Sequence, residues 1–297
     1  MASRADLPHR ARTLTRPRNR DLFAGTANER TGGASGQVNA TARREGAAWV
    51  VNGEKYYSTG GLYASWFSTQ ALAEDGTTVR FTVPVDSAGV ERLDDFDAVG
   101  QRLTASGTTH FTHVRVSDDE LTSLGASPPD NPWTDSFAQL YLAAVQAGVA
   151  ARAFDDAVWY VREKVRPIKH SSANKRRRGS VRGRDRRTCA GSTSCRAVGG
   201  RDTRGRSGSH RARRARPGAA AAVHVAQAGA IAIESALKAA ELLFDVGGSS
   251  ITNRDLGFDR HWRNARTAAD HNPRQWKYAV AGAYHLTGEE PPTTGLF

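Results

Sequence analysis

The stretch from Asn174 to Pro217 limits the fold most, because it does not suit any packed element. Its 44 residues include 16 Lys and Arg, two acidic residues and no aromatic residue. A segment with so few large apolar side chains buries too little surface to offset the entropy lost on ordering. We therefore expect no regular packed structure within residues 174–217.

The same stretch also accounts for the basic character of the chain. The formal net charge is +12, and residues 174–217 carry +14 of it. Residues 1–20 add another +5, so the remainder is acidic at −7. Basic arms bind nucleic-acid phosphates, but this one lacks the aromatic residues that stack on bases. We expect no nucleic-acid partner and keep a basic-armed nucleic-acid-binding protein as an alternative.

The cysteines and the apolar runs exclude several further classes. Cys189 and Cys195 are the only two cysteines, and no histidine pair follows them at zinc-finger spacing. We expect neither a metal site nor a disulfide framework. No run of about 18 apolar residues predicts a membrane span, and residues 1–20 lack the apolar core of a secretory signal. These features predict a cytoplasmic protein.

Residues 21–120 show the patterns of a β domain. Asn52-Gly53 lies between two apolar and aromatic runs in the stretch Trp49–Tyr57, which predicts a hairpin turn at that dipeptide. Short alternating runs predict three further strands, separated by turns at Asp75-Gly76 and Asp86–Gly89: Trp66–Leu72, Val79–Val83 and Thr108–Val116. Short strands at this spacing indicate a small barrel or sandwich.

The second half of the chain shows helical periodicity after a linker at 121–133. We predict helices at Ser136–Val165, Ala219–Val246, Asp259–Ala269 and from near Pro273 to Leu286. In the first of them an apolar stripe is expected at Phe137, Leu140, Leu142, Val145, Val149, Phe154, Val158 and Val161. The predicted fold is α+β, with a small β-barrel or sandwich (21–120) followed by an antiparallel helical bundle (134–297) that residues 174–217 interrupt.

Three stretches together resemble the acyl-CoA dehydrogenase family, and most closely its flavin-dependent monooxygenase branch, whose members act on small sulfur compounds. The first, Leu22–Gly33, resembles the loop that runs beneath the flavin. The second, Trp49–Gly61, resembles the strands beside the isoalloxazine ring, and the third, Leu243–Pro292, resembles the C-terminal signature. The resemblance covers about residues 21–173 and 218–297.

The resemblance implies a set of cofactor-binding residues, each of which also has an ordinary structural explanation. The implied residues are Asn28, Tyr57, Ser58, Thr59, Arg166, Gly247 and Gly248. Hydroxyl and amide groups suit the edge of a flavin, where charge builds up on reduction. An arginine fork and a glycine pair suit its phosphate. The alternatives are turn residues, a core tyrosine, a charged helix end and a helix C-cap.

The resemblance also implies the chemistry. His271 stands where the dehydrogenases commonly place a glutamate base, and with Asn28 and Ser58 it would hydrogen-bond the flavin as the flavin reacts with oxygen. The implied activity is oxygenation of a small, sulfur-containing compound with reduced FMN supplied by a flavin reductase. The alternative is an acyl-CoA dehydrogenase with FAD, in which Asp270 would be the base.

Two departures from the family lead to further expectations. The match starts near Asp21, so the family's N-terminal helical domain has no counterpart here, and residues 174–217 stand where a bundle helix is expected. Runs such as Arg176–Arg178 fit out-of-frame GC-rich coding sequence, and we hypothesise a frameshifted segment; a genuine basic insertion is the alternative. Without these two parts we expect little or no activity. The resemblance implies a homo-oligomer, which is typical of the family, but the interrupted bundle leaves the oligomeric state of this chain open.

Overall fold

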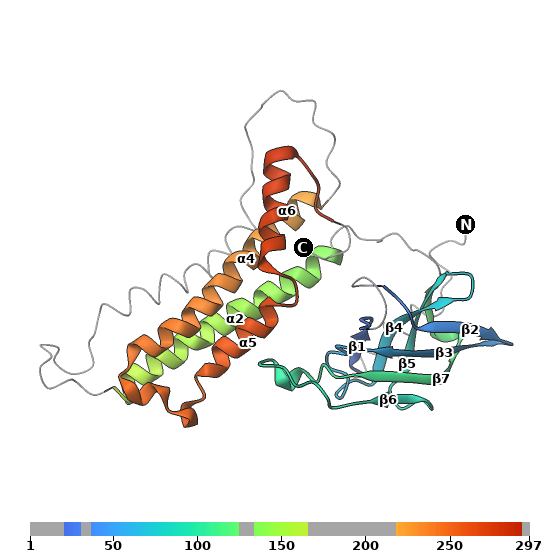
Figure 1. The fold of residues 1–297 in the computed structure, drawn as a ribbon, viewed down its shortest axis with the longest axis horizontal. Coiled ribbons are helices and arrows are strands. Elements are labelled where there is room, and N and C mark those ends of the chain that lie inside the picture. The colour runs from blue at the N-terminus through green and yellow to red at the C-terminus, as the bar shows by residue number, and fades with distance from the viewer. Residues whose placement is uncertain (1–20, 31–36, 125–133, 166–217, 293–297) are drawn as a thin grey trace, which may run out of the picture. The chain divides into compact units, whose positions relative to one another are not determined.

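The computed structural model describes residues 21–30, 37–124, 134–165 and 218–292. They form two compact units, which Figure 1 shows as a sheet and a set of helices. Of the described residues, 21–30, 37–98 and 102–124 form the β unit, and 99–101, 134–165 and 218–292 form the helical unit. The α+β class is confirmed. Arg166, both cysteines and the predictions for 1–20 and 174–217 lie outside the described residues.

The β unit is built on one mixed sheet of eight strands. In chain order they are β1 (Phe23–Thr26), β2 (Thr41–Glu45), β3 (Ala48–Lys55), β4 (Trp66–Ala73), β5 (Thr78–Pro84), β6 (Val90–Arg92), β7 (Thr109–Ser117) and β8 (Leu121–Leu124). The sheet order is β6-β7-β3-β2-β4-β5-β8, and β1 pairs with β4 in parallel. Short 3-10 turns, η2 (Arg102–Thr104) and η3 (Asp118–Glu120), flank β7.

The core of the β unit lies on one face of these strands. Aromatic and β-branched side chains alternate along them and are fully buried, as β propensity favours. The largest are Phe67, Phe81, Val79, Val83, Val114 and Val116. The three strands predicted at Trp66–Leu72, Val79–Val83 and Thr108–Val116 match β4, β5 and β7 within two residues at each end.

The hairpin predicted at Asn52-Gly53 is wrong. Strand β3 runs straight through this dipeptide, and its register with β7 shifts between Val51 and Gly53, which is a β-bulge. Asn52 Oδ1 accepts a hydrogen bond from the His113 N–H at 2.8 Å, and a Cβ on Gly53 would lie 2.5 Å from Ala40 Cβ. The hairpin turn instead follows β2 at Gly46, whose φ of +63° suits glycine.

The predicted linker at 121–133 starts too early. Residues 121–124 form strand β8, which pairs with β5, so the β unit extends beyond residue 120. The residues around Thr122-Ser123 have the composition of a loop, so the sequence does not indicate this strand. The strand is stabilised by its pairing with β5 and not by an apolar pattern of its own.

Among the described residues the helical unit contains four helices, and three of the predicted ranges match within two residues at each end. The fourth, Ala219–Val246, includes the 3-10 turn Leu243–Val246 that follows the helix. The four helices are α2 (Thr134–Glu163), α4 (Ala219–Leu242), α5 (Asp259–Ala269) and α6 (Arg274–Thr287). Between α4 and α5 lie three 3-10 turns: η4 (Leu243–Val246), η5 (Ser249–Thr252) and η6 (Arg254–Leu256). Pro273 is the N-cap of α6, consistent with proline's preference for helix starts.

Helices α2 and α4 pack side by side along their length in parallel (Figure 1). Ala150 and Ala153 share a core cluster with Ala236 and Ala239. About two turns further along α2, Tyr160 packs with Leu243. Parallel neighbours need a connection that returns along the bundle, and the sequence predicts the missing antiparallel helix at that point in chain order.

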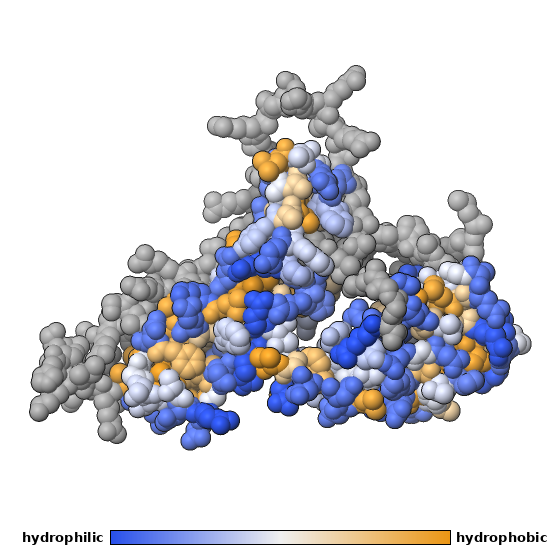
Figure 2. All heavy atoms as spheres, in the orientation of Figure 1, coloured by the Kyte–Doolittle hydropathy of each residue, from blue (hydrophilic) through white to orange (hydrophobic). Residues whose placement is uncertain are grey.

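The buried seam of α2 consists of small and polar residues, so the predicted apolar stripe is wrong. Apart from Asp156, buried positions recur every three and four residues in turn: Ser136, Gln139, Ala143, Gln146, Ala150, Ala153, Ala157 and Tyr160. This is a heptad pattern, which favours close packing of two helices. None of the eight predicted stripe residues is fully buried. Figure 2 shows hydrophobic residues among hydrophilic ones on the bundle surface.

Helix α4 is also the apolar core of the unit. Among the described residues, only the stretch Ala219–Val246 is long and apolar enough to cross a membrane, and half of its apolar window is buried in the bundle. Because α2, α5 and α6 all pack against α4, a core helix accounts for this composition.

Candidate functional site

The predicted flavin residues of the β unit gather where β3 ends. The Tyr56 N–H donates to the Asn28 carbonyl at 2.8 Å, which joins the Leu22–Arg30 segment to the loop that starts at Tyr56. Tyr57 has a φ of +56°, a strained conformation for a bulky residue. The Ser58 N–H holds the loop by donating to the Gly107 carbonyl at 3.1 Å. The structure therefore brings Asn28, Tyr57, Ser58 and Thr59 together.

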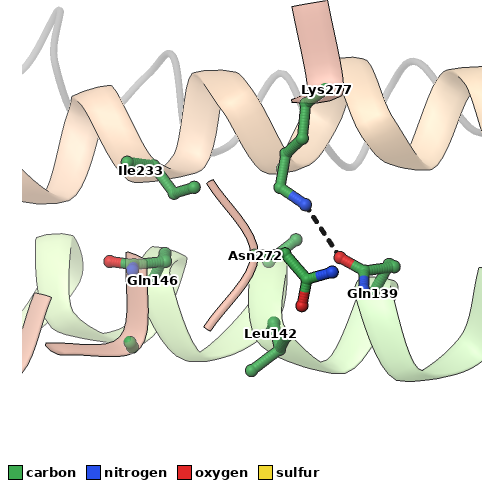
Figure 3. Close-up of a pocket in the computed structure, with 9 residues that line it drawn as sticks. Gln139, Leu142, Gln146, Ile233, Asn272 and Lys277 are labelled. Carbon is green, nitrogen blue, oxygen red and sulfur yellow. Dashed lines mark hydrogen bonds between the residues drawn. The ribbon is translucent and has the colours of Figure 1, made fainter. Parts of the chain in front are cut away.

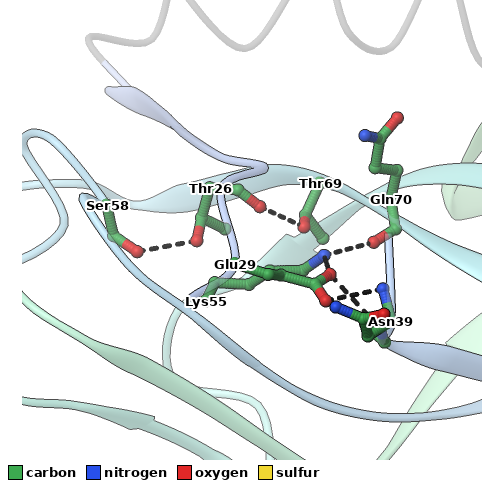
Figure 4. A network of polar contacts seen from close by, with 8 residues as sticks. Thr26, Glu29, Asn39, Lys55, Ser58, Thr69 and Gln70 are labelled. Atoms are coloured by element: carbon green, nitrogen blue, oxygen red, sulfur yellow. Dashed lines mark hydrogen bonds and ion pairs between the residues drawn. The ribbon is translucent and has the colours of Figure 1, made fainter. Parts of the chain in front are cut away.

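The Ser58 hydroxyl is buried and hydrogen-bonded within the β unit. Its Oγ lies 2.6 Å from Thr26 Oγ1 and 2.8 Å from Thr109 Oγ1 (Figure 4 shows the contact with Thr26). Thr69 Oγ1 extends this network by donating to the Thr26 carbonyl. Because its hydroxyl is fully enclosed, the geometry favours Ser58 as a residue that positions the loop.

A buried ion pair fixes the neighbouring segment, and the sequence analysis missed it. The side chains of Glu29 and Lys55 are each 1% exposed and pair directly (Figure 4). Lys55 Nζ also donates to the Gln70 carbonyl at 2.8 Å, and Glu29 accepts the Asn39 N–H at 2.6 Å. Burial lowers the pKa of Lys55, and the Glu29 carboxylate partly offsets this. The pair anchors the stretch next to Asn28.

A hollow of about 190 Å³ lies beside these residues in the β unit. It is lined by Arg30, Tyr56, Tyr57, Asp95, Phe96, Asp97, Ala98, Ser106, Gly107 and Thr108. The Arg30 guanidinium lies 4.3 Å from the ring centroid of Tyr56 and 5.1 Å from that of Tyr57. Figure 4 shows the adjoining polar network but not this hollow. The half-exposed ring of Tyr57, a cation and hydroxyl groups suit a flat ligand with polar edges.

Two polar residues that line the hollow, Ser106 and Asp95, are held in fixed positions. Thr59 Oγ1 lies 2.9 Å from Ser106 Oγ. Asp95 accepts hydrogen bonds from the Thr108 N–H at 2.7 Å and from its hydroxyl at 2.6 Å. Burial raises the pKa of Asp95, but these hydrogen bonds and the Arg30 charge outweigh burial, so its pKa is lowered. Asp95 is therefore an anion at neutral pH and offers only acceptors.

The two predicted glycines in the helical unit differ in their surroundings. A Cβ on Gly247 would lie 2.6 Å from Tyr160 Cε1 and 3.0 Å from Ile251 Cβ, so helix packing accounts for this glycine. A Cβ on Gly248 would meet nothing within 4 Å. Gly248 therefore has room for a ligand, and Gly247 serves the fold.

His271 lies at the other end of α5, in the turn before α6. The 11 residues of α5 separate it from the Gly247-Gly248 end by about 16 Å, at 1.5 Å of rise per residue. Its side chain is exposed, and Nδ1 lies 2.5 Å from Oδ1 of the buried Asn272. The structure therefore does not bring His271 and the glycine pair together.

Two buried ionisable groups of the bundle also escaped the sequence analysis. His261 is 4% exposed, and its Nε2 lies 2.7 Å from Asp156 Oδ2. Burial is the main cause of its lowered pKa, opposed by the hydrogen bond to Asp156. Lys277 is 5% exposed and donates to Gln139 Oε1 at 2.8 Å (Figure 3). Burial lowers the pKa of Lys277 to about 8.

The fold, a β unit followed by a helical unit, is acyl-CoA dehydrogenase-like. A flavin- and indole-bound structure of the monooxygenase TdsC from Paenibacillus sp. A11-2 has a TM-score of 0.83 at 23% identity, covering 97% of this chain and 76% of that one. A probable acyl-CoA dehydrogenase from Mycobacterium abscessus has a TM-score of 0.70 at 20% identity, covering 94% and 75%.

Sequence comparison narrows the similarity to one branch. Dibenzothiophene monooxygenase of Rhodococcus qingshengii is 29% identical over 283 residues, which cover 86% of this chain and 65% of that protein. SfnC of Pseudomonas putida, named a probable FMNH2-dependent monooxygenase, is 28% identical over 81% of this chain and 63% of its own length. The chain thus spans just under two thirds of these relatives. No protein-family model matches it. The predicted resemblance to the flavin-dependent monooxygenase branch is confirmed.

Proposed function

We propose that the chain belongs to a flavin-dependent oxidoreductase that oxygenates a small sulfur-containing compound. The observation that carries the proposal is the 29% identity to dibenzothiophene monooxygenase over 86% of the chain. That alignment is long enough to take in both units. The hollow beside Tyr57 supports it, since the strained loop and the exposed ring lie where the family resemblance expects the flavin.

FMN is the proposed cofactor, because SfnC is named FMNH2-dependent and TdsC is solved with FMN. When reduced and bound, FMN supplies the activation of oxygen. The hollow of about 190 Å³ is smaller than the 300–1,000 Å³ typical of ligand pockets, so it would hold only part of the molecule.

The residues present fit such a group in distinct roles. Tyr57 offers a half-exposed ring to a planar ligand, and the Thr59 hydroxyl and Asn28 offer hydrogen bonds to its edge. Ser58 keeps the loop in place from within the sheet. Gly248 leaves space for a phosphate, and His271 would donate or accept a proton. Arg166 stays a proposed phosphate ligand.

The structure favours the monooxygenase over the dehydrogenase alternative at one position. Asp270, the alternative base, is engaged by Arg266, whose Nε lies 3.2 Å from Asp270 Oδ2 on the exposed side of the α5 end. A carboxylate that abstracts a proton from a thioester works better when it is not paired with an arginine. The proposed partners are a flavin reductase, the substrate and further copies of the chain, in the cytoplasm.

Flavin titration of the full chain tests the proposal. We expect saturable FMN binding that quenches flavin fluorescence and exceeds FAD binding, and a weakened interaction in Tyr57→Ala. Tyr63→Ala is the matched control, because Tyr63 is 58% exposed in the same unit outside the hollow. Preferential FAD binding with oxidation of an acyl-CoA would support the dehydrogenase instead. The absence of any FMN effect would contradict the proposal and agree with the sequence-based expectation of little or no activity.

A further inference from the structure

The turn between α5 and α6 contains a buried asparagine next to the proposed catalytic histidine. Asn272 is 2% exposed, whereas the His271 side chain reaches solvent. Their contact joins His271 Nδ1 to Asn272 Oδ1 at 2.5 Å. An amide oxygen only accepts hydrogen bonds, so His271 Nδ1 must carry the proton in this contact.

The opposite end of the same amide faces a small cavity inside the bundle (Figure 3). The cavity measures about 10 Å³, which is room for one water molecule. Among the described residues, Asn272 Nδ2 and Gln146 Oε1 are buried and have no protein partner. Both residues line this cavity. Figure 3 shows the Asn272 amide nitrogen pointing towards Gln139 and the Gln146 oxygen pointing away from Asn272.

The two ends of Asn272 therefore agree on one orientation of its amide. The oxygen towards His271 leaves the N–H group pointing towards Gln139, whose Oε1 is an acceptor (Figure 3). In a neutral imidazole the hydrogen bond at one nitrogen decides which nitrogen keeps the lone pair. With the proton on Nδ1, Nε2 is left as the acceptor.

We infer that Asn272 is a positioning residue that holds neutral His271 in the Nδ1–H tautomer and so makes Nε2 its proton-accepting atom. The role of this tautomer in catalysis rests on the proposed function. The inference that His271 carries its proton on Nδ1 does not depend on that function. A turned amide is the competing arrangement. It would present its oxygen to the cavity that Lys277 also lines and an N–H to His271, and His271 would then carry its proton on Nε2.

The ¹⁵N chemical shifts of the imidazole nitrogens distinguish these arrangements in the full chain without flavin. The His271 signals are assigned by their loss in His271→Gln. We expect Nδ1 protonated and Nε2 unprotonated in the neutral wild type. Asn272→Leu should turn this into a mixture of tautomers, and Asn272→Asp, which keeps an acceptor oxygen, should restore Nδ1–H. Gln146→Leu is the control, because it removes a buried amide from the same cavity without touching His271.

A dominant Nε2–H signal in the wild type would overturn the inference, and so would a tautomer unchanged in Asn272→Leu. The wild-type spectrum decides the matter even if Asn272→Leu fails to fold. If FMN titration fails while the Nδ1–H tautomer is found, the proposed function is wrong and the inference about Asn272 stands.

Discussion

Lys277→Met is expected to stabilise the helical unit at neutral pH. Lys277 is 5% exposed on α6, and its stem passes over Gly229, where an added Cβ would lie 3.2 Å from Lys277 Cδ. Its ammonium donates to Gln139 Oε1 at 2.8 Å, among amide and apolar side chains that line the adjoining cavity. Burial in such surroundings penalises the charged form.

The size of the effect follows from the pKa of Lys277. Burial lowers it from 10.5 to about 8, which corresponds to about 3 kcal/mol at most. Allowing for solvent screening, we take about 2 kcal/mol as the stability lost by burying the charge. Methionine has a similar length and removes this penalty, but the hydrogen bond to Gln139 contributes about 1 kcal/mol. The expected net gain at pH 7 is therefore about 1 kcal/mol.

The pH dependence provides a sharper check than the size. A lysine whose pKa is lower in the folded state binds fewer protons there than in the unfolded chain between about pH 8 and 10.5. Wild-type stability therefore rises with pH across this window, and the stability of Lys277→Met lacks this rise. The advantage of the variant should shrink and disappear towards pH 10.5.

Urea unfolding of the full chain, followed by helical circular dichroism at pH 7 and pH 9.5, measures both effects. Lys238→Met is the control, because Lys238 is half exposed and pairs with Glu241 on the same bundle. It should change stability by less than about 0.5 kcal/mol. A loss of more than about 2 kcal/mol in Lys277→Met, or a difference between the two proteins that does not vary with pH, would refute the reasoning.

Further predictions concern other buried contacts. Glu29→Gln leaves the ammonium of its ion pair buried without a carboxylate and should lower the unfolding free energy of the β unit by about 3–5 kcal/mol. Gly247→Ala should lower that of the helical unit by about 1–3 kcal/mol through the clash with the Tyr160 ring, whereas Gly248→Ala should be neutral. Burial lowers the pKa of His261, so stability should fall as the pH drops below about 6.5, and His261→Gln should flatten this dependence. Equal effects of the two glycine variants, or unchanged acid sensitivity in His261→Gln, would contradict these expectations.

Helix positions could be predicted from the sequence because their signals are local. The range 259–269 matches α5 at both ends, and Pro273 marks the start of α6. The seam of α2 could not be predicted in the same way. Large apolar residues such as Phe137 and Leu140 drew the prediction, but they are 71% and 50% exposed in the described chain. Small residues face α4 because they allow the two backbones to approach closely.

The Asn52-Gly53 dipeptide shows how a correct local signal leads to a wrong element. In the structure both residues stay within β3, and the extra residue of the bulge lies in the facing strand, where Thr112 and His113 oppose Asn52 and His113 has a φ of +52°. Only the pairing of β3 with β7, which lies some 60 residues away in the sequence, separates this outcome from a hairpin.

At the candidate site the family resemblance located the loop, but not the role of each side chain. Tyr57 and Thr59 are exposed as a ligand-binding role requires, whereas the Ser58 hydroxyl is fully used within the sheet. Its partners Thr26 and Thr109 come from distant strands, so no sequence spacing indicates the cluster. Burial of a polar residue is a tertiary property, and the sequence analysis had no means to detect it.

Three of the buried charged residues that the sequence analysis missed lie close to residues that it selected, whereas His261 and Asp156 do not. Glu29 follows Asn28 directly, and Lys55 lies two residues before Tyr57. Lys277 lines the cavity that Asn272 shares, behind His271. Buried charges lower stability unless they are well paired, and departures from local rules of this kind are expected near functional sites. The family resemblance and the burial of charge are independent observations, and they coincide at two places in the chain, around Asn28 and Tyr57 and around His271.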